Sequence, residues 1–308
     1  MNEFQTRRRI VDLLPGYLLQ RRTGWTPMSH LPDSITLPEY LLLRRVAIER
    51  DEGPIPYAEL QANLPNPYSI IDPILDGLPR LVELGLLDQL RDAYALTPAG
   101  TAVLMRNERA ANDYAARHLR LLPDDLIRLA SMANDIAERL HQAPEPANKA
   151  HQDRVPRLRR FDQRQTPPVQ LEYALYALQR ARDDAHIAAW RAAGFRGPSF
   201  ELLSRVWAGA ATSTQLVEQT HGRMRAEDVT ALLDELERDG YVSLEYPVVT
   251  IADRGRQVRD AIERETDRVF FAPWPDIDAG WVSDQLEALG ASLSPHAHDD
   301  DSGGEFDR

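Results

Sequence analysis

The sequence contains no cysteine, and this absence excludes disulfide bonds, thiolate metal ligands and cysteine nucleophiles. Lysine is nearly absent too, since Lys149 is the single lysine among 36 basic residues. Long apolar runs are also missing, and none approaches the roughly 18 residues that predict a membrane-spanning helix. The basic start at Arg7 to Arg9 is followed by a short, interrupted apolar run without a small-residue cleavage site. We therefore expect no signal peptide and a cytoplasmic chain.

The common sequence motifs of catalysis are missing as well. The chain has no glycine-rich phosphate loop, no dinucleotide-binding Gly-x-Gly-x-x-Gly, no Gly-x-Ser-x-Gly nucleophile elbow and no His-Glu-x-x-His zinc motif. Each of these motifs supplies a phosphate cradle, an activated nucleophile or a metal site that the corresponding chemistry needs. We therefore predict a protein that is not an enzyme and that uses no cofactor and no metal.

Acidic residues outnumber basic ones by 48 to 36, which gives a formal net charge of −12. This balance argues against a protein whose whole surface binds nucleic acid, because the phosphates would repel it. It leaves room for binding through a local basic patch, so the charge has to be considered region by region.

The strongest pattern in the chain is an internal repeat. Four glycines mark it, because Gly85 and Gly100 in the first half have the same spacing as Gly240 and Gly255 in the second half. The match extends upstream of the glycines. Residues 38–46 correspond to residues 198–206, and residues 81–100 correspond to residues 236–255. An internal repeat of this kind indicates that one supersecondary unit occurs twice.

Each copy predicts a helix, a short helix, a longer helix, a β-hairpin and a final helix. The helices have apolar residues at helical spacing, a glycine suited to a left-handed C-cap follows the third helix, and polar residues separate two short apolar runs. For the first copy we expect a helix from Thr36, helices at 57–64 and 68–84, strands at 86–87 and 94–96, and a helix from Thr97. For the second copy we expect helices at 199–208, 214–220 and 226–239, strands at 241–244 and 248–251, and a helix from Asp253.

The recognition-helix candidate of the first copy, taken from Asn66 to Gly85, contains Pro67, Pro73 and Pro79. Proline removes a backbone hydrogen bond and clashes with the preceding turn, so this helix should be broken or should start late. A broken helix is a poor probe of the major groove. We therefore expect the first unit to be mainly structural.

Both halves resemble known families. The string Leu96-Thr97-Pro98-Ala99-Gly100, after the helix stop at Leu84-Gly85-Leu86-Leu87, resembles the wing of MarR-type regulators over residues 36–118. Residues 170–293 resemble the SalK-like helix-turn-helix family of actinomycetes, through the strings at 182–190, 193–197, 259–268 and 272–274. The pattern and the resemblances imply a mainly α fold, in which two winged helix-turn-helix modules, each with a small β-hairpin wing, are joined by a helical layer.

Composition divides the chain into five segments. We expect a basic N-terminal arm over residues 1–31, a first winged helix over 32–120, connecting helices over 121–193 with a proline-flanked basic linker at 144–168, a second winged helix over 194–293, and a disordered acidic tail over 294–308.

Contacts to DNA are expected at the start of the third helix of the second copy, because this end of the helix reaches base edges in helix-turn-helix proteins. Two further arginines flank the end of the wing, and the arginines of the linker could follow phosphates. The candidate DNA-binding residues are Thr220, His221, Arg223, Arg225, Arg254, Arg256, Arg157, Arg159 and Arg160. The alternative is that these side chains only solvate a turn and a connector.

Two further interpretations concern the middle of the chain. A heptad-like stripe suggests a homodimer through the connecting helices; it consists of Leu126, Leu129, Ala133, Ile136 and Leu140. A cavity for a small-molecule effector could be lined by His186, Trp190, Trp207 and Trp274. The alternative for these four side chains is that they fill a core, as aromatic residues usually do.

These patterns favour a DNA-binding transcriptional regulator whose partner is double-stranded DNA. A protein–protein interaction module whose winged helices have lost DNA binding is the main alternative. A weaker alternative is a small-molecule sensor or an enzyme that uses a cavity between the modules.

Overall fold

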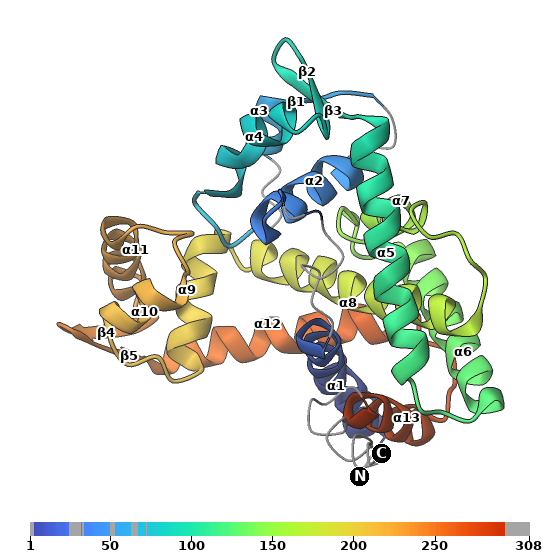
Figure 1. Ribbon diagram of the computed structural model, residues 1–308. Helices are drawn as coiled ribbons and strands as arrows, with labels where there is room; N and C mark the ends of the chain where they lie inside the picture. The colour runs from blue at the N-terminus through green and yellow to red at the C-terminus, as the bar shows by residue number, and fades with distance from the viewer. Residues whose placement is uncertain are drawn as a thin grey trace, which may run out of the picture.

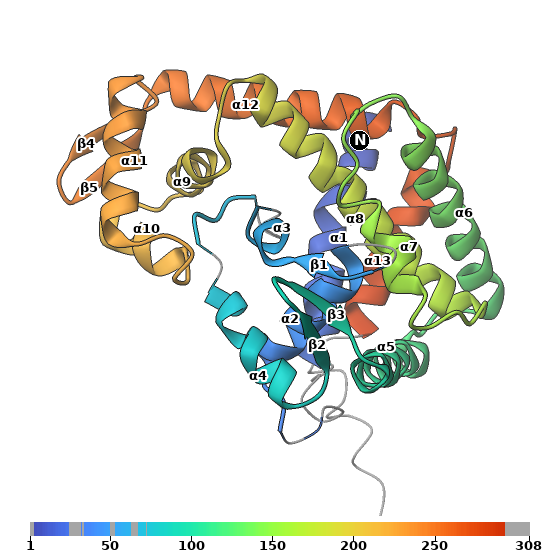
Figure 2. The ribbon, with the colours of Figure 1, turned by 90° about the horizontal axis from the view of Figure 1, so that it is seen from above.

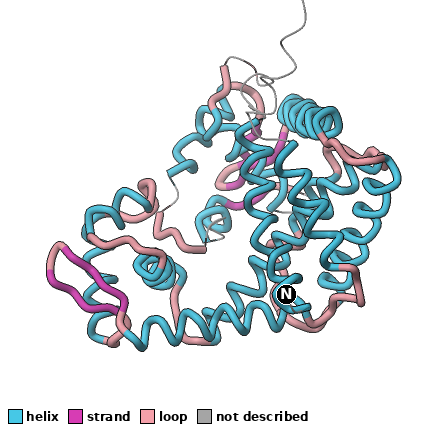
Figure 3. Tube along the Cα trace, turned by 90° about the horizontal axis from the view of Figure 1, so that it is seen from below, coloured by secondary structure: helices cyan, strands magenta, loops and turns pink. Residues whose placement is uncertain are grey.

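The computed structural model describes residues 3–24, 32, 34–49, 53–62, 67–71 and 73–292 (Figure 1). The fold is mainly helical, with one small antiparallel sheet in each half, which confirms the predicted fold class. The expected acidic tail at 294–308 lies outside the described residues. Figure 3 shows the hairpin of the second half at the edge of the molecule.

The first module forms around a core of its own, and its third helix is short. Its elements are α2 (Leu37–Glu49), β1 (Ile55–Pro56), α3 (Tyr57–Ala62), the 3₁₀ helix η2 (Pro73–Gly77), α4 (Leu78–Glu83), β2 (Leu87–Leu90), β3 (Ala93–Leu96) and α5 (Pro98–His118). The sheet has the order β1-β3-β2, and Leu87 pairs with Leu96. A 3₁₀ turn that starts at Pro73 replaces the first part of the expected third helix, and α4 begins only at Leu78. The prediction that proline breaks or delays this helix is therefore confirmed.

The second module follows its predicted elements to within one or two residues. These elements are α9 (Gly197–Trp207), α10 (Ser213–Gln219), α11 (Ala226–Arg238), β4 (Val242–Glu245), β5 (Val248–Ile251) and α12 (Asp253–Phe271). Local capping explains where the helices start. The Thr212 hydroxyl accepts a hydrogen bond from the Gln215 amide at 3.2 Å, and the Asp228 carboxylate accepts one from the Arg225 amide at 3.0 Å.

The same backbone turn ends α4 and α11. Gly85 and Gly240 both have a positive φ, 67° and 75°, which glycine adopts without a steric penalty. The next amide in each copy donates back to a helix carbonyl, from Leu86 to Leu81 at 2.9 Å and from Tyr241 to Leu236 at 2.8 Å. The chain then turns directly from the helix into the wing.

A second pair of glycines lets the final helix of each module approach this turn. A Cβ added at Gly100 would lie less than 3.0 Å from the carbonyl oxygen of Leu86, and one added at Gly255 would lie equally close to that of Tyr241. Real Cβ atoms do not approach a carbonyl oxygen so closely. Glycine is therefore required at both positions for the helix to pack against the wing.

The remaining helices form a bundle beside the two modules. It contains α1 (Glu3–Gly24), α6 (Pro123–Gln142), α8 (Pro167–Ala192), the C-terminal part of α12, and α13 (Ala279–Ser292). Helix α1 lies along α13, and α6 lies along α8 (Figures 1 and 2). Four of the five heptad-like residues of α6 are buried in this core, and Leu126 packs against it. The stripe is therefore used within the chain and offers no face to a second protomer.

Helix α8 contributes to three cores along its 26 residues. Val169 and Tyr173 belong to the core of the first module. The middle of the helix, from Leu171 to Ala185, belongs to the bundle. Ile187, Ala189 and Trp190 pack with Phe200 and Ile262, next to the second module. The expected division at residue 193 therefore falls at the end of a helix that all three parts share.

None of the helices in the described part of the chain is both long enough and apolar enough to cross a membrane.

Candidate nucleic-acid interface

The turn between α10 and α11 is the place where helix-turn-helix proteins meet the DNA. His221 is exposed there with a φ of 50°, and the Arg225 side chain is 68% exposed. Thr220 was expected beside them but is fully buried, and its hydroxyl donates to the Val217 carbonyl at 2.7 Å. Thr220 therefore holds the turn together and is not accessible to a duplex.

Arg223 is also engaged within the protein. Its guanidinium donates to the Thr220 carbonyl at 2.8 Å and to the Glu201 carboxylate at 3.2 Å. Its own carbonyl accepts hydrogen bonds from the amides of Ile70 and Ile71, at 3.0 and 3.2 Å. Both the side chain and the backbone of Arg223 therefore hold other parts of the chain, and the expected groove contact of Arg223 stays a prediction.

The two hydrogen bonds from Ile70 and Ile71 belong to a contact between the modules, which we call the seam. It joins residues 67–71, in the helix-turn-helix turn of the first module, to the corresponding turn of the second module, and the modules lie next to each other (Figure 2). Tyr68 packs against Trp190 with 6.0 Å between ring centroids, and burial raises the pKa of the Tyr68 hydroxyl to about 12. Ser69 is buried. The seam therefore covers the recognition-helix approach of the first module.

Gly197 provides a test of the seam. A Cβ added at this first residue of α9 would lie less than 3.0 Å from the backbone of Pro67, with Tyr68 also in contact. Because the three nearest atoms all belong to the first module, Gly197→Ala should displace residues 67–71 and leave the second module folded. We expect the amides of 68–71 to exchange with deuterium about tenfold faster, as measured by mass spectrometry. Gly280→Ala, which meets one side-chain oxygen at ordinary contact distance, is the control. Unchanged exchange in Gly197→Ala would contradict the seam.

The exposed face of α11 and the wing are acidic. Glu227, Asp234 and Glu237 are exposed on α11, and Glu245 is exposed on β4. Arg225 at the start of α11 and Arg238 at its end are the exposed cations of this helix. The tip of the wing is tied to the helix, since the Tyr246 hydroxyl donates to Asp234 at 2.8 Å. This face as a whole repels phosphate, and Arg225, the cation at its N-terminal end, lies 3.9 Å from the Glu227 carboxylate.

The two arginines after the wing lie at the other end of α11. The Arg254 guanidinium donates to the Asp239 carbonyl at 2.7 Å and lies 4.7 Å from the Tyr241 ring centroid. Arg256 is exposed on the first turn of α12. These residues are therefore separated from Arg225 by the length of α11, about 20 Å at 1.5 Å per residue.

The linker arginines support the first module. Within residues 144–168 the chain forms α7 (Arg154–Arg159), whose Val155 and Leu158 are buried. Arg157 donates to the carbonyls of Ile48 and Glu49, at 3.3 and 2.6 Å, and Arg160 donates to the carbonyl of Ala47 at 2.5 Å. These carbonyls are among the last of α2, where cations satisfy unpaired acceptors and interact favourably with the helix dipole.

Arg159, the third linker residue predicted to contact DNA, donates to the Gln165 side chain at 2.8 Å. The expectation that the linker is a phosphate-tracking arm is therefore wrong, because Arg157 and Arg160 cap a helix. The N-terminal arm is likewise a packed helix over residues 3–24. In α1, Arg8 pairs with Glu263 and Asp267 of α12, and Arg9 pairs with Glu287 of α13.

The four residues of the expected ligand cavity do not come together. His186 and Trp190 contact Phe200 edge-on and stacked, at 5.3 and 6.1 Å, and the exposed Trp207 lies under Arg259. Trp274 belongs to the core of the bundle instead. Trp190 and Trp274 therefore fill two separate cores, as the alternative interpretation held, whereas Trp207 is exposed. A pocket of about 70 Å³ lies elsewhere, between the start of α9 and the end of α11, and contains none of the four.

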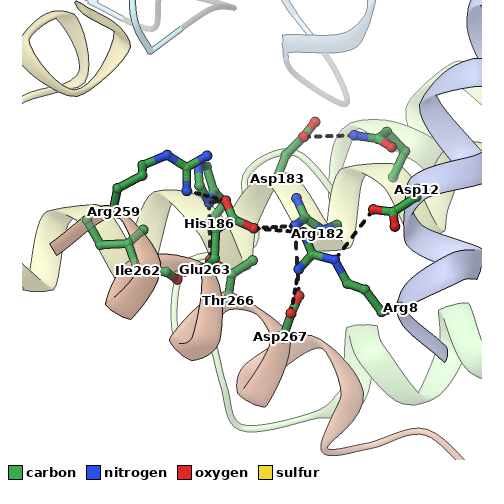
Figure 4. A network of polar contacts seen from close by, with 11 residues as sticks. Arg8, Asp12, Arg182, Asp183, His186, Arg259, Ile262, Glu263, Thr266 and Asp267 are labelled. Carbon is green, nitrogen blue, oxygen red and sulfur yellow. Dashed lines mark hydrogen bonds and ion pairs between the residues drawn. The ribbon is translucent and has the colours of Figure 1, made fainter. Parts of the chain in front are cut away.

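A charged network between α1, α8 and α12 was not expected from the sequence (Figure 4). Glu263 accepts hydrogen bonds from Arg8 at 3.2 Å, from Arg182 at 2.9 Å and from Arg259. Burial alone would raise the pKa of Glu263, but the surrounding arginines together outweigh it and lower the pKa to about 2. The sequence does contain a signal for this network, because charged residues recur four apart on one helix face. These residues are Arg182 and His186 on α8, and Arg259, Glu263 and Asp267 on α12.

His186 lies inside this network, 3.1 Å from the Thr266 hydroxyl and 3.7 Å from Glu263. Burial is the main cause that lowers its pKa from 6.5 to about 4; Glu263 opposes the shift, and Arg259, Arg182 and Arg8 reinforce it. The imidazole is therefore neutral at physiological pH. Within the described residues, no group of three His, Asp or Glu side chains is arranged to hold a metal ion.

This lowered pKa predicts a loss of stability in mild acid. Between pH 6.5 and about 4 the unfolded state binds a proton at His186 that the folded state does not, so the free energy of unfolding falls as the pH drops through this window. We expect a loss of about 2–3 kcal/mol in wild type that His186→Gln does not show, measured by urea titrations at each pH. His141→Gln, at an exposed histidine, should keep the wild-type profile. Parallel profiles for wild type and His186→Gln would show that His186 is not involved.

Comparison with known proteins agrees with the fold of the second half. Residues 157–300 match a helix-turn-helix family, and the matched segment contains α9 to α13 with the complete second module. The match does not extend to residues 36–118, so the MarR-like resemblance of the first module is unsupported. No curated protein and no solved structure matches the chain. A helix-turn-helix domain suggests DNA as the partner, and such families are typically not catalytic.

Proposed function

We propose that this protein binds double-stranded DNA and regulates transcription. The observation that carries the proposal is the complete helix-turn-helix and wing of the second module, within the segment that matches a helix-turn-helix family. His221 and Arg225 are exposed at the start of α11, which is the end that enters a major groove in this class of fold. These two residues replace the longer set expected from the sequence as candidates for groove contacts.

The acidic face of α11 sets the character of this binding. With Asp234 and Glu237 exposed further along α11, only a shallow insertion of the N-terminal end keeps these two carboxylates away from phosphates, while Glu227 stays close to Arg225. The affinity should therefore be modest and should depend steeply on salt, because cations outside α11 must supply much of it.

The test is fluorescence anisotropy with genomic duplexes of random sequence, from low to moderate salt. We expect binding that weakens as salt rises. Arg225→Ala should lower the affinity about fivefold, whereas Arg139→Ala, at an exposed arginine on α6, should not change it. The absence of binding at the lowest salt would overturn the proposal.

The acidic face favours one second candidate, a module that binds a basic segment of another protein. Loss of DNA binding leaves a winged helix with a free surface, and here that surface carries exposed carboxylates on both α11 and the wing. Glu227→Lys together with Asp234→Lys separates the candidates, since these changes should strengthen DNA binding and weaken capture of a basic protein partner.

A further inference from the structure

The outward face of α5 carries a row of arginines. Arg106, Arg109 and Arg117 are exposed on this helix, and Arg120 follows immediately after its end. At 100° per residue, Arg106, Arg109 and Arg117 fall within an arc of about 80°, because they are separated by three and eight residues. The opposite face is buried against the first module and α8. Figure 1 shows α5 along an outer edge of the molecule.

Carboxylates near this stripe are neutralised or point inward. Asp113, in the middle of the stripe, is paired with Arg164 at 2.5 Å. Arg164 also pairs with the buried Asp162 at 2.6 Å. The other acid of the helix, Glu108, is buried and accepts a hydrogen bond from Arg44 at 3.2 Å.

The stripe is therefore a local excess of positive charge on an acidic protein. It comprises four arginines and two aspartates, namely Arg106, Arg109, Arg117 and Arg164 with Asp113 and Asp162. The chain as a whole has a net charge of −12. A concentrated cationic surface against this background attracts a polyanion, and arginine in particular favours phosphate.

The dimensions of the stripe suit a nucleic-acid backbone. From Arg106 to Arg117 the helix rises about 17 Å, a length over which each strand of a duplex presents about five phosphates. Ala102 and Ala116 are exposed on the same side of the helix and are small, so a backbone can approach closely. The start of α5 is held next to the wing of the first module. Thr97, which follows the wing, is the N-cap, and its hydroxyl accepts a hydrogen bond from the Gly100 amide at 3.0 Å.

We propose that the outward face of α5 binds the phosphate backbone of double-stranded DNA and supplies the sequence-independent part of the affinity. This inference rests on the proposed function, because it names where that duplex lies. The helix-turn-helix of the first module has a broken recognition helix and is covered by the seam. The proposal therefore assigns DNA binding in this module to α5 instead. Phosphate contacts of this kind position a duplex and carry no sequence information.

The test compares two triple variants with the same change in net charge. The stripe variant is Arg106→Ala, Arg109→Ala and Arg117→Ala. The control variant is Arg191→Ala, Arg264→Ala and Arg268→Ala, at exposed arginines of α8 and α12. Circular dichroism and thermal melting establish that both are folded. Binding of a random duplex is then measured by anisotropy between roughly 50 and 200 mM salt.

We expect the stripe variant to lose about 30-fold in affinity and its salt slope to fall by about three, while the control stays within about threefold of wild type. If wild type binds and the stripe variant binds like the control, the inference about α5 is overturned and the proposed function stands. If wild type does not bind at all, the proposed function fails and takes the inference with it. Displacement of the duplex from the stripe by polyglutamate at equal charge concentration would also overturn it, because the face would then bind polyanions of any kind.

Discussion

Replacing Gly255 by alanine is expected to destabilise the second module by about 3 kcal/mol or more, and Gly100→Ala should do the same to the first. At either position the new methyl group would lie less than 3.0 Å from a backbone carbonyl oxygen, of Tyr241 or of Leu86. Backbone cannot rotate away as a side chain can, so the final helix must separate from the wing. The free energy of unfolding, measured by urea titration, checks both variants.

Gly16→Ala is the matched control for these two substitutions. Gly16 lies within α1, is exposed, and has nothing within 4 Å of an added Cβ. Alanine has the higher helix propensity, so this variant should be as stable as wild type or more stable by up to about 1 kcal/mol. A loss of less than about 1 kcal/mol in Gly255→Ala would show that α12 does not pack as closely on the wing as described.

Removal of the Glu263 carboxylate should have a comparably large effect. Three guanidinium groups, of Arg8, Arg182 and Arg259, converge on this one side chain (Figure 4). Glu263→Ala leaves these cations close together and without their shared partner, in a partly buried place. Breaking a buried network in this way costs about 3–5 kcal/mol. Helices α1, α8 and α12 meet here, so the bundle should loosen, and α1 should become sensitive to proteolysis.

Glu265→Ala provides the comparison two residues further along α12. Glu265 pairs with Arg268 at 2.8 Å, but both side chains are about half exposed. Exposed pairs contribute little, so this variant should lose less than about 1 kcal/mol. Equal losses for Glu263→Ala and Glu265→Ala would contradict the described network.

The second module could be predicted almost completely from the sequence. Thr212, Asp228 and Gly240 act through local backbone geometry, and local geometry is what a sequence pattern encodes most directly. The delayed start of α4 could be predicted for the same reason, because proline acts on its own turn.

The expected DNA contacts were less predictable, because they depend on tertiary partners. Nothing in the local sequence shows that Arg157 and Arg160 reach the carbonyls at the end of α2, more than a hundred residues earlier. The partners of the Arg223 carbonyl are equally distant, since Ile70 and Ile71 lie in the other module. An arginine that faces solvent and one that caps a helix look alike in a sequence.

The arginine stripe of α5 is a different case, because its spacing is visible in the sequence. Arg106, Arg109 and Arg117 have a helical period, and the apolar residues of this helix fall on the other side. The net positive charge of this face can be seen only in the structure, because the structure shows that Arg164 pairs with Asp113 and that Glu108 is buried.

The sharing of α8 among three cores has a consequence for how the protein unfolds. A helix about 38 Å long cannot leave one core without being lost to the other two, so unfolding of one part should spread to the others. The chain should melt in one cooperative step, although it contains two recognisable modules. Truncation after residue 193 would leave the apolar side of α8 without Phe200 and Ile262, so each half would be obtained as an aggregating fragment and not as a separate domain.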